Sequence, residues 1–165
     1  MRTAIYPGTF DPITNGHLDL IERGLMIFDE IIVAVAPSPK KQPLFSLDHR
    51  LYLIKESVKQ FTHVKVEAFD SLLVEYAKSR GGIAIIRGLR AVSDYEYELQ
   101  MTLMNRKLDN NIVTVFMMPS LRYSFLSSTI VKEVVSFGGS VKGLVPDSVE
   151  LALSEAFRGT EDLIK

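Results

Sequence analysis

Apolar residues recur along the chain in two alternating patterns, short continuous runs and longer stripes at three- and four-residue steps. Runs of this kind are typical of strands covered on both faces, and the stripes are typical of amphipathic helices. The runs predict strands at residues 3–6, 31–36, 64–68, 83–86 and 113–118. The stripes predict helices at about residues 17–28, 47–61, 72–77, 93–108 and 127–138, and from 147 onward.

Strand and helix therefore alternate five times along the chain. This order predicts an α/β fold, a Rossmann-like doubly wound sheet of five parallel strands with helices on both faces. No linker, repeat or low-complexity segment interrupts it, so we expect one domain over residues 1–165. In such sheets ligands bind beyond the carboxyl ends of the strands, where the strand order reverses.

Composition narrows the classes of function. The chain is 47% hydrophobic and 24% charged with a formal net charge of −1, so it lacks the basic character of a duplex-binding protein. It has no cysteine, which excludes disulfides, thiolate catalysis and zinc–thiolate sites. No signal peptide is recognisable, and no apolar run approaches the ~20 residues that cross a bilayer. We expect a cytoplasmic protein without a nucleic-acid or membrane partner.

The turn after the first strand carries the strongest chemical signal. Prolines and glycines break the strand over residues 6–12, and Thr14-Asn15-Gly16-His17 leads into the first helix. A helix start offers unpaired N–H donors and the positive end of the helix dipole, both of which favour a phosphate. Gly16 would allow a ligand to approach the backbone closely. A lone histidine is usually structural, but this context favours His17 as a group that acts on a nucleotide phosphate.

Further candidates for phosphate binding each follow a later strand. Lys40 and Lys41 lie in a proline-rich loop after the second strand, and Arg87 and Arg90 flank a glycine after the fourth. Three hydroxyl residues, 127–129, open the helix after the fifth strand. Each group also has a plainer interpretation, as solvated lysines, as surface ion pairs with nearby acids, or as helix N-caps. Because all of them follow parallel strands, we expect them to converge at one edge of the sheet.

Residues 6–17 resemble the T-x-G-H signature of the nucleotidyltransferase superfamily. The whole run is similar to the phosphopantetheine adenylyltransferases of bacterial coenzyme A synthesis. Residues 86–91 (I-R-G-L-R-A) and 123–132 (Y-S-F-L-S-S-T-I-V-K) match two further motifs of that family in order and spacing. Tyr123 departs from the tryptophan that some members carry. The resemblance extends from Arg2 to about Phe157.

The resemblance implies transfer of the adenylyl group of ATP to 4′-phosphopantetheine by direct in-line attack, giving dephospho-coenzyme A and pyrophosphate. It also implies Mg²⁺ held mainly by the ATP phosphates rather than by protein ligands, inhibition by coenzyme A, and a homo-hexamer. The implied catalytic residues are His17 and Lys41, and the implied acceptor contacts are Thr9, Lys41, Leu73 and Arg87. The implied ATP contacts are Thr9, Phe10, His17, Gly88, Leu89, Arg90, Glu98, Tyr123, Ser124, Phe125, Leu126, Ser127, Ser128 and Thr129.

Other functions share parts of this pattern. Nicotinamide mononucleotide adenylyltransferases and cytidylyltransferases have the first signature, but Lys41 and the R-G-L-R segment favour pantetheine. A non-catalytic nucleotide-sensing module would not need Lys41 and Arg87. A nicotinamide dehydrogenase and a P-loop NTPase are disfavoured because neither glycine-rich motif is present.

Overall fold

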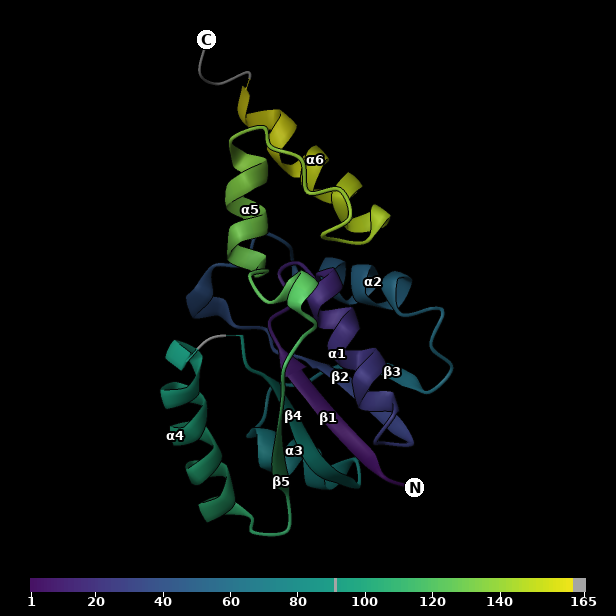
Figure 1. Cartoon of the computed structure of the whole chain (residues 1–165), viewed down its shortest axis with the longest axis vertical. Helices are drawn as coiled ribbons and strands as arrows, with labels where there is room; N and C mark the ends of the chain where they lie inside the picture. Colours follow the sequence, from purple (N-terminus) through teal and green to yellow (C-terminus); the bar gives the residue numbers. More distant parts are fainter. Residues whose placement is uncertain (91, 162–165) are drawn as a thin grey trace.

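The computed structural model describes residues 1–90 and 92–161, without the side chains of 92, 93 and 159–161 (Figure 1). Five strands form one sheet in the order β3-β2-β1-β4-β5, and all neighbours are parallel. The strands are β1 (Thr3–Gly8), β2 (Glu30–Val35), β3 (Val64–Ala68), β4 (Gly82–Gly88) and β5 (Val113–Met117). The predicted five-stranded Rossmann-like sheet is therefore confirmed.

A helix connects each strand to the next, and two further helices follow the last strand in the sequence. The helices are α1 (Asn15–Leu25), α2 (Leu47–Ser57), α3 (Leu73–Ser79), α4 (Val92–Leu108), α5 (Ser128–Ser136) and α6 (Asp147–Glu161). Two 3₁₀ turns, η1 (Pro39–Lys41) and η2 (Leu121–Tyr123), lie in loops. Figure 1 shows α5 and α6 beyond the carboxyl ends of the strands.

Alternation along the strands divides the core between the two faces of the sheet. Ala4 and Tyr6 of β1 belong to a buried cluster with residues of α1, α2, α5 and α6. Ile5, between them, belongs to a second cluster with residues of α3. Both faces are covered, which is why β2 is buried along its entire length.

The first two helices differ most from their predicted bounds, whereas the other elements agree with theirs to within two residues. α1 begins at Asn15 rather than at about residue 17, because Thr14 caps it. It also ends at Leu25, and α2 ends at Ser57, although the apolar stripes continue to Phe28 and Phe61. Both aromatic residues pack onto the core from the following loops, so the stripe outlasts the helix.

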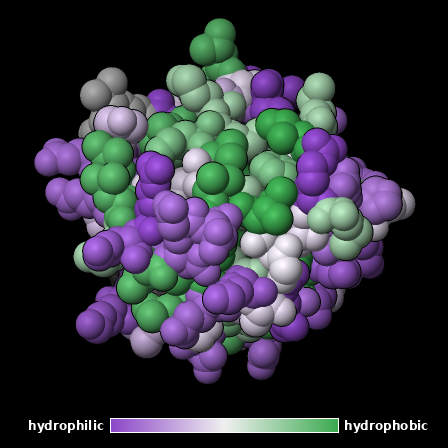
Figure 2. Space-filling view, turned by 90° about the horizontal axis from the view of Figure 1, so that it is seen from below, coloured by the Kyte–Doolittle hydropathy of each residue, from purple (hydrophilic) through white to green (hydrophobic). Residues whose placement is uncertain are grey.

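The outer helix α4 buries little of its apolar surface. Figure 2 shows apolar and polar surface interleaved on the face seen from below. Large apolar side chains of α4 are among the exposed ones: Tyr95, Tyr97, Met101, Leu103, Met104 and Leu108. Exposed apolar residues in such number on one helix indicate a surface suited to contact with another molecule.

Candidate active site

A cavity of about 720 Å³ opens at the carboxyl ends of β1 and β4, where the strand order reverses. Residues from both neighbouring loops and from the starts of α1 and α5 line it. The predicted site residues among them are Thr9, Phe10, His17, Lys41, Arg87, Gly88, Arg90, Glu98, Tyr123, Leu126, Ser127, Ser128 and Thr129. The structure therefore brings residues as far apart in the chain as Thr9 and Thr129 together at the predicted edge of the sheet.

Thr14 and His17 form a capping box at the start of α1. The Thr14 hydroxyl accepts the backbone N–H of His17, and the backbone N–H of Thr14 donates to Nδ1 of His17 across 3.0 Å. Capping boxes usually place Glu or Gln at the third helical position, and here a histidine takes it. Because a backbone N–H can only donate, Nδ1 is an acceptor and the proton of the neutral ring lies on Nε2.

His17 is held in this state by its surroundings. Burial, and then the positive charge of Arg90, lower the pKa of His17 to about 4. Its ring packs edge-on against Phe10, with 5.1 Å between centroids. At neutral pH the residue is therefore an uncharged hydrogen-bond donor in a fixed orientation at the cavity.

Phe10 adopts a left-handed backbone conformation, with φ of 47°. This conformation is uncommon for a bulky residue and costs roughly 1–3 kcal/mol. The Phe10 side chain is buried against Tyr6 and His17, so only its backbone remains for contact with a ligand. That placement matches the backbone role implied by the resemblance, which stays a prediction.

The adjacent lysines of the proline-rich loop differ in position. Both lie in η1 and both are exposed, but Lys41 lines the cavity and Lys40 is absent from its lining. Within the described part of the chain, no side chain pairs with Lys41, whereas the other cavity cations have carboxylate partners. Lys41 is thus available to a ligand anion.

Arg87 lies at the end of β4 and is paired with Glu98 of α4. The Nε and Nη2 atoms of Arg87 both donate to the Glu98 carboxylate, and Nη1 donates to the Pro7 carbonyl across 3.3 Å. Burial disfavours the charge of Arg87, but the hydrogen bonds and attraction from Glu98 prevail and raise its pKa. Glu98 is itself buried. A nucleotide contact by Glu98 stays a prediction, and in this arrangement its carboxylate orients Arg87.

Gly88 and Arg90 shape the neighbouring wall of the cavity. A Cβ at Gly88 would lie 2.6 Å from Cδ1 of Leu20, so the glycine lets β4 end against α1. Arg90 pairs with Asp94 at 3.4 Å, and its Nη1 donates to the Leu126 carbonyl across 3.2 Å. This last bond links the β4 loop to the segment that opens α5.

The three hydroxyl residues at the start of α5 have different partners. Ser127 is the N-cap and accepts the backbone N–H of Ile130, as its plainer interpretation predicts. The Ser128 hydroxyl donates to the Pro12 carbonyl across 2.7 Å. Among the described residues, none forms a hydrogen bond with the Thr129 hydroxyl, which is exposed at the cavity. The start of α5 therefore offers Thr129 and unpaired helix N–H groups to an anion.

Sequence reasoning missed a buried carboxylate, that of Asp11. It accepts the backbone N–H groups of Leu44 and Phe45 and pairs with Lys132 of α5 at 2.7 Å. Both Asp11 and Lys132 line the cavity. A signal was present, since Asp11 lies within the first motif and Lys132 ends the last one. Asp94 and Tyr97 were missed as lining residues as well.

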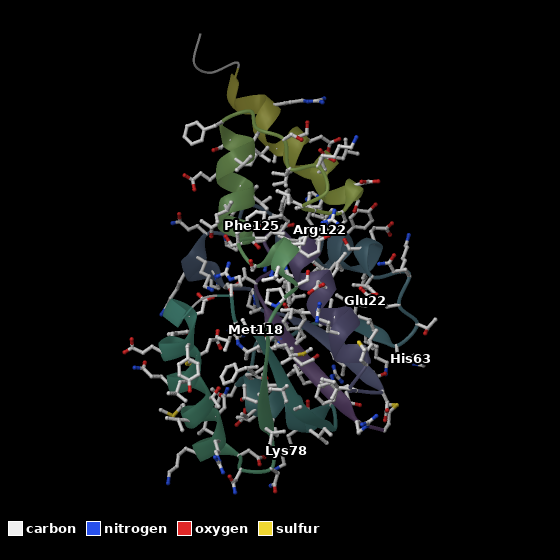
Figure 3. The ribbon with its side chains drawn as sticks, in the orientation of Figure 1. Glu22, His63, Lys78, Met118, Arg122 and Phe125 are labelled. Carbon is white, nitrogen blue, oxygen red and sulfur yellow. The ribbon has the colours of Figure 1, made fainter. Side chains whose placement is uncertain are left out.

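Some predicted residues lie away from the cavity lining. Leu73, the first residue of α3, packs on the core cluster of the opposite face. Leu89 continues the sheet through a backbone bond to Met117, and Ser124 donates to the Leu121 carbonyl. Phe125 is 57% exposed, and Figure 3 shows it with Arg122 in the segment that leads into α5. Ligand contacts by these four predicted residues stay predictions.

The carboxylates of the cavity are all used by protein cations. Asp11, Asp94 and Glu98 pair with Lys132, Arg90 and Arg87 respectively. Over the described residues there is no cluster of three or more acidic or histidine side chains placed to hold a metal ion. None of the described helices is both long and apolar enough to cross a membrane.

Comparison with known proteins agrees with this geometry. Residues 5–134 match the family model of the cytidylyltransferase-like proteins. The phosphopantetheine adenylyltransferase of Thermodesulfovibrio yellowstonii is 58% identical over 158 residues, 95% of this chain and 98% of its own. The enzyme of the same name from Alkaliphilus oremlandii is 55% identical over 157 residues, 95% of this chain and 100% of its own.

A solved structure supports the fold alone. It comes from Vibrio parahaemolyticus and is named as a candidate nicotinate-nucleotide adenylyltransferase. It superposes with a TM-score of 0.70 over 95% of both chains at 18% identity. The match of residues 5–134 to that family model identifies the chain as a nucleotidyltransferase of the cytidylyltransferase-like class, and the helix N-termini and the Lys and Arg residues at the carboxyl edge of the sheet are consistent with it. Within that class, the chain belongs to the phosphopantetheine adenylyltransferase family.

Proposed function

We propose that this chain transfers the adenylyl group of ATP to 4′-phosphopantetheine, releasing pyrophosphate and forming dephospho-coenzyme A. One observation carries the proposal: the starts of α1 and α5, His17 and Lys41 all line a single cavity with Arg87 and Arg90. Two phosphate-bearing substrates have to meet in this reaction, and anion-binding groups on both sides of the cavity suit such a meeting.

ATP is placed with its phosphates over the starts of α1 and α5. Neither helix has an acidic residue in its first turn, so both dipoles favour an anion there. Thr129 and the unpaired N–H groups of α5 would contact the terminal phosphates. Arg90, already bonded to the α5 segment through Leu126, would lie beside them.

The acceptor phosphate is placed between Arg87 and Lys41. Glu98 occupies the Nε–Nη2 edge of Arg87. The guanidinium has five N–H donors in a fixed plane, so its Nη1–Nη2 edge keeps hydrogens for a phosphate. Thr9 follows β1 and lines the same cavity as the two cations. Its hydroxyl lies 3.0 Å from that of Ser38, so it connects the loop after β1 to the loop that carries Lys41.

The chemistry proposed is direct displacement at the α-phosphorus. An oxygen of the phosphopantetheine phosphate forms the new P–O bond while the bond to the bridging oxygen of pyrophosphate breaks. The nucleophile is already an anion, so no general base is required, and catalysis consists of positioning and charge stabilisation. The Nε2–H of His17 and the ammonium of Lys41 would donate to the oxygens of the α-phosphate as negative charge accumulates.

We propose Mg²⁺ as the cofactor, bound mainly by ATP phosphates and water. The carboxylates that line the cavity are paired with protein cations, so they form no cage for the ion. Mg²⁺ keeps several water ligands and is often bound through substrate phosphates. When bound, it supplies neutralisation of the triphosphate charge.

Two further proposals concern regulation and assembly. Coenzyme A carries the pantetheine arm and the adenine of the reaction partners, so we propose that it competes for the same cavity. We also propose a homo-hexamer, and the exposed apolar residues of α4 offer a surface for contact between subunits. Inhibition kinetics with coenzyme A against each substrate test the first proposal. Analytical ultracentrifugation tests the second.

One assay tests the function itself. Purified protein with Mg²⁺ and ATP should release pyrophosphate with 4′-phosphopantetheine and should not do so with dephosphorylated pantetheine. Nicotinamide mononucleotide, glycerol phosphate and nicotinate mononucleotide serve as competing acceptors in parallel reactions. A higher kcat/KM with any of them would overturn the proposed acceptor and leave nucleotidyl transfer intact.

A further inference from the structure

Arg50 is a buried cation that the proposed chemistry does not use. It lies in the first turns of α2 and is only 2% exposed. Its guanidinium donates to four backbone carbonyls: Nε to Phe45, Nη1 to Thr9 and Ala36, and Nη2 to Pro37. The donor–acceptor distances are 3.1, 2.7, 2.8 and 3.0 Å respectively.

The partners of Arg50 are uncharged, which makes its presence costly. A buried cation loses its hydration, and apolar residues of similar volume often replace buried charges without loss of stability. Burial lowers the pKa of Arg50, and the Coulombic attraction of Asp11 opposes that effect. One rigid guanidinium that bonds four carbonyls fixes the positions of the backbone segments that carry them. Stability alone would not require a cation here.

The four carbonyls belong to two loops that carry proposed catalytic and binding residues. Thr9 and Ala36 share the Nη1 atom, so one nitrogen ties the end of β1 to the end of β2. Two contacts reinforce this link, between the Thr9 and Ser38 hydroxyls and from the Ala36 N–H to the Gly8 carbonyl. Arg50 thus fixes the point from which the loop with Lys41 departs.

The loop itself carries strain that needs such a hold. Ser38 and Gln42, which flank η1 on its two sides, have φ of 48° and 44°. Left-handed conformations at residues other than glycine cost roughly 1–3 kcal/mol each and persist where the surroundings over-determine them. At the far end, Phe45 is held by Arg50 and its N–H by Asp11. The strained turn with Lys41 is therefore fixed at both ends.

We propose that Arg50 is a positioning residue that holds Lys41 and Thr9 in register across the cavity by clamping the β1–α1 and β2–α2 loops together. This inference rests on the adenylyl transfer proposed above. Arg50 touches no substrate in it and acts through the two loops. Its guanidinium is required because an ammonium is a point charge and cannot reach all four carbonyls.

The test compares Arg50→Lys with two matched controls. Arg23→Lys makes the same change at an exposed arginine of α1, and Val74→Ala opens a core cavity on the opposite face of the sheet. Arg50→Lys should lower kcat about tenfold or more while the KM for ATP stays within about threefold, because misplacement of the catalytic group is the defect. In the Lys41→Ala background the same change should cost less than about threefold, because residues that act as a unit are non-additive.

Amide hydrogen exchange supplies a readout that does not depend on activity. Exchange over residues 36–45 should accelerate about tenfold or more in Arg50→Lys while the other strands and helices keep their protection. Arg23→Lys should change neither readout, and Val74→Ala should raise exchange around α3 with little change in kcat. A wild-type protein without transferase activity would overturn the proposed function, and the exchange result would still decide whether Arg50 holds the loop.

Other outcomes overturn the positioning role. Arg50→Lys with normal kcat would do so, as would losses that simply add to those of Lys41→Ala. Arg50→Lys that fails to fold, or that loses protection throughout the chain, would make Arg50 a residue of general stability. Arg50→Ala, measured in parallel, should show a larger loss of kcat than Arg50→Lys, and an equal or smaller loss would also contradict the proposal.

Discussion

Glu98 holds the guanidinium of Arg87 along one edge, with 2.6 Å between Nε of Arg87 and Oε2 of Glu98. The two residues are eleven positions apart, one at the end of β4 and the other on α4. The carboxylate fixes the plane of the guanidinium, so its Nη1–Nη2 edge faces any ligand in the same orientation.

This relationship predicts that Arg87→Lys impairs the enzyme although the charge is kept. The KM for phosphopantetheine should rise about tenfold or more, since a lysine cannot copy a bidentate contact. ATP binding should change little. Calorimetric titration of each ligand into the variant checks this, and Glu98→Gln should show the same pattern more weakly. If ATP binding collapsed while phosphopantetheine binding stayed intact, Arg87 would bind ATP and Arg90 the acceptor phosphate, the reverse of the roles proposed here.

His17 is expected to act in the transition state. His17→Ala should lower kcat roughly 10²-fold or more with a smaller rise in the KM for ATP, as for loss of one preorganised donor. His17→Asn is the control that can keep the hydrogen bond from Thr14 and hence the helix start. Steady-state kinetics separate the two parameters. Near-normal kcat with weakened ATP binding would make His17 a ground-state binder.

The adjacent lysines should behave differently. Lys41 lines the cavity and lacks a described ion-pair partner, so Lys41→Ala should nearly abolish turnover. Lys40→Ala removes the same charge one residue away and should stay within a few-fold of wild type. Pyrophosphate release under identical conditions measures both. The reverse result would show that the catalytic role belongs to Lys40.

The hydroxyls at the start of α5 should separate into structural and binding roles. Ser127→Ala removes an N-cap and should cost about 1 kcal/mol of stability. Thr129→Val removes a hydroxyl that points to no described partner and should weaken ATP binding while stability stays within about 0.5 kcal/mol. Denaturant unfolding and ATP titration distinguish them. Equal effects on stability would contradict the division.

The depressed pKa of His17 predicts a pH dependence of stability. The pKa is about 4 in the folded chain and 6.5 in a model peptide, so the unfolded chain binds the proton first. Stability from this group is complete above pH 6.5 and is lost as the pH falls toward 4, by up to about 3 kcal/mol. The unfolding free energy of His17→Asn should be less pH-dependent across that window. Identical pH profiles for variant and wild type would contradict the depressed pKa of the His17 ring.

Much of the fold and part of the site follow from local sequence. The five strands and their helices were predicted because the apolar periodicity and the residues that start and end a helix depend only on neighbours along the chain. The start of α1 and the cap of α5 are local too, since Thr14 and Ser127 bond to residues three positions later. Parallel strands then place their following loops at one edge, which is why Lys41, Arg87 and residues 127–129 converge.

Only the tertiary structure decided which side chains pair within the cavity. Arg50 lies on a helix where a charge is normally solvated, and it is buried because loops from two strands close over it. Asp11 and Lys132 pair although they are 121 positions apart in the sequence. The plane of Arg87 is fixed by Glu98, which lies eleven positions later on α4. Leu73 and Phe125, predicted at the site, lie outside its lining. Sequence determined the elements through local hydrogen bonds and periodicity, whereas these contacts arise from the packing of segments that are distant along the chain.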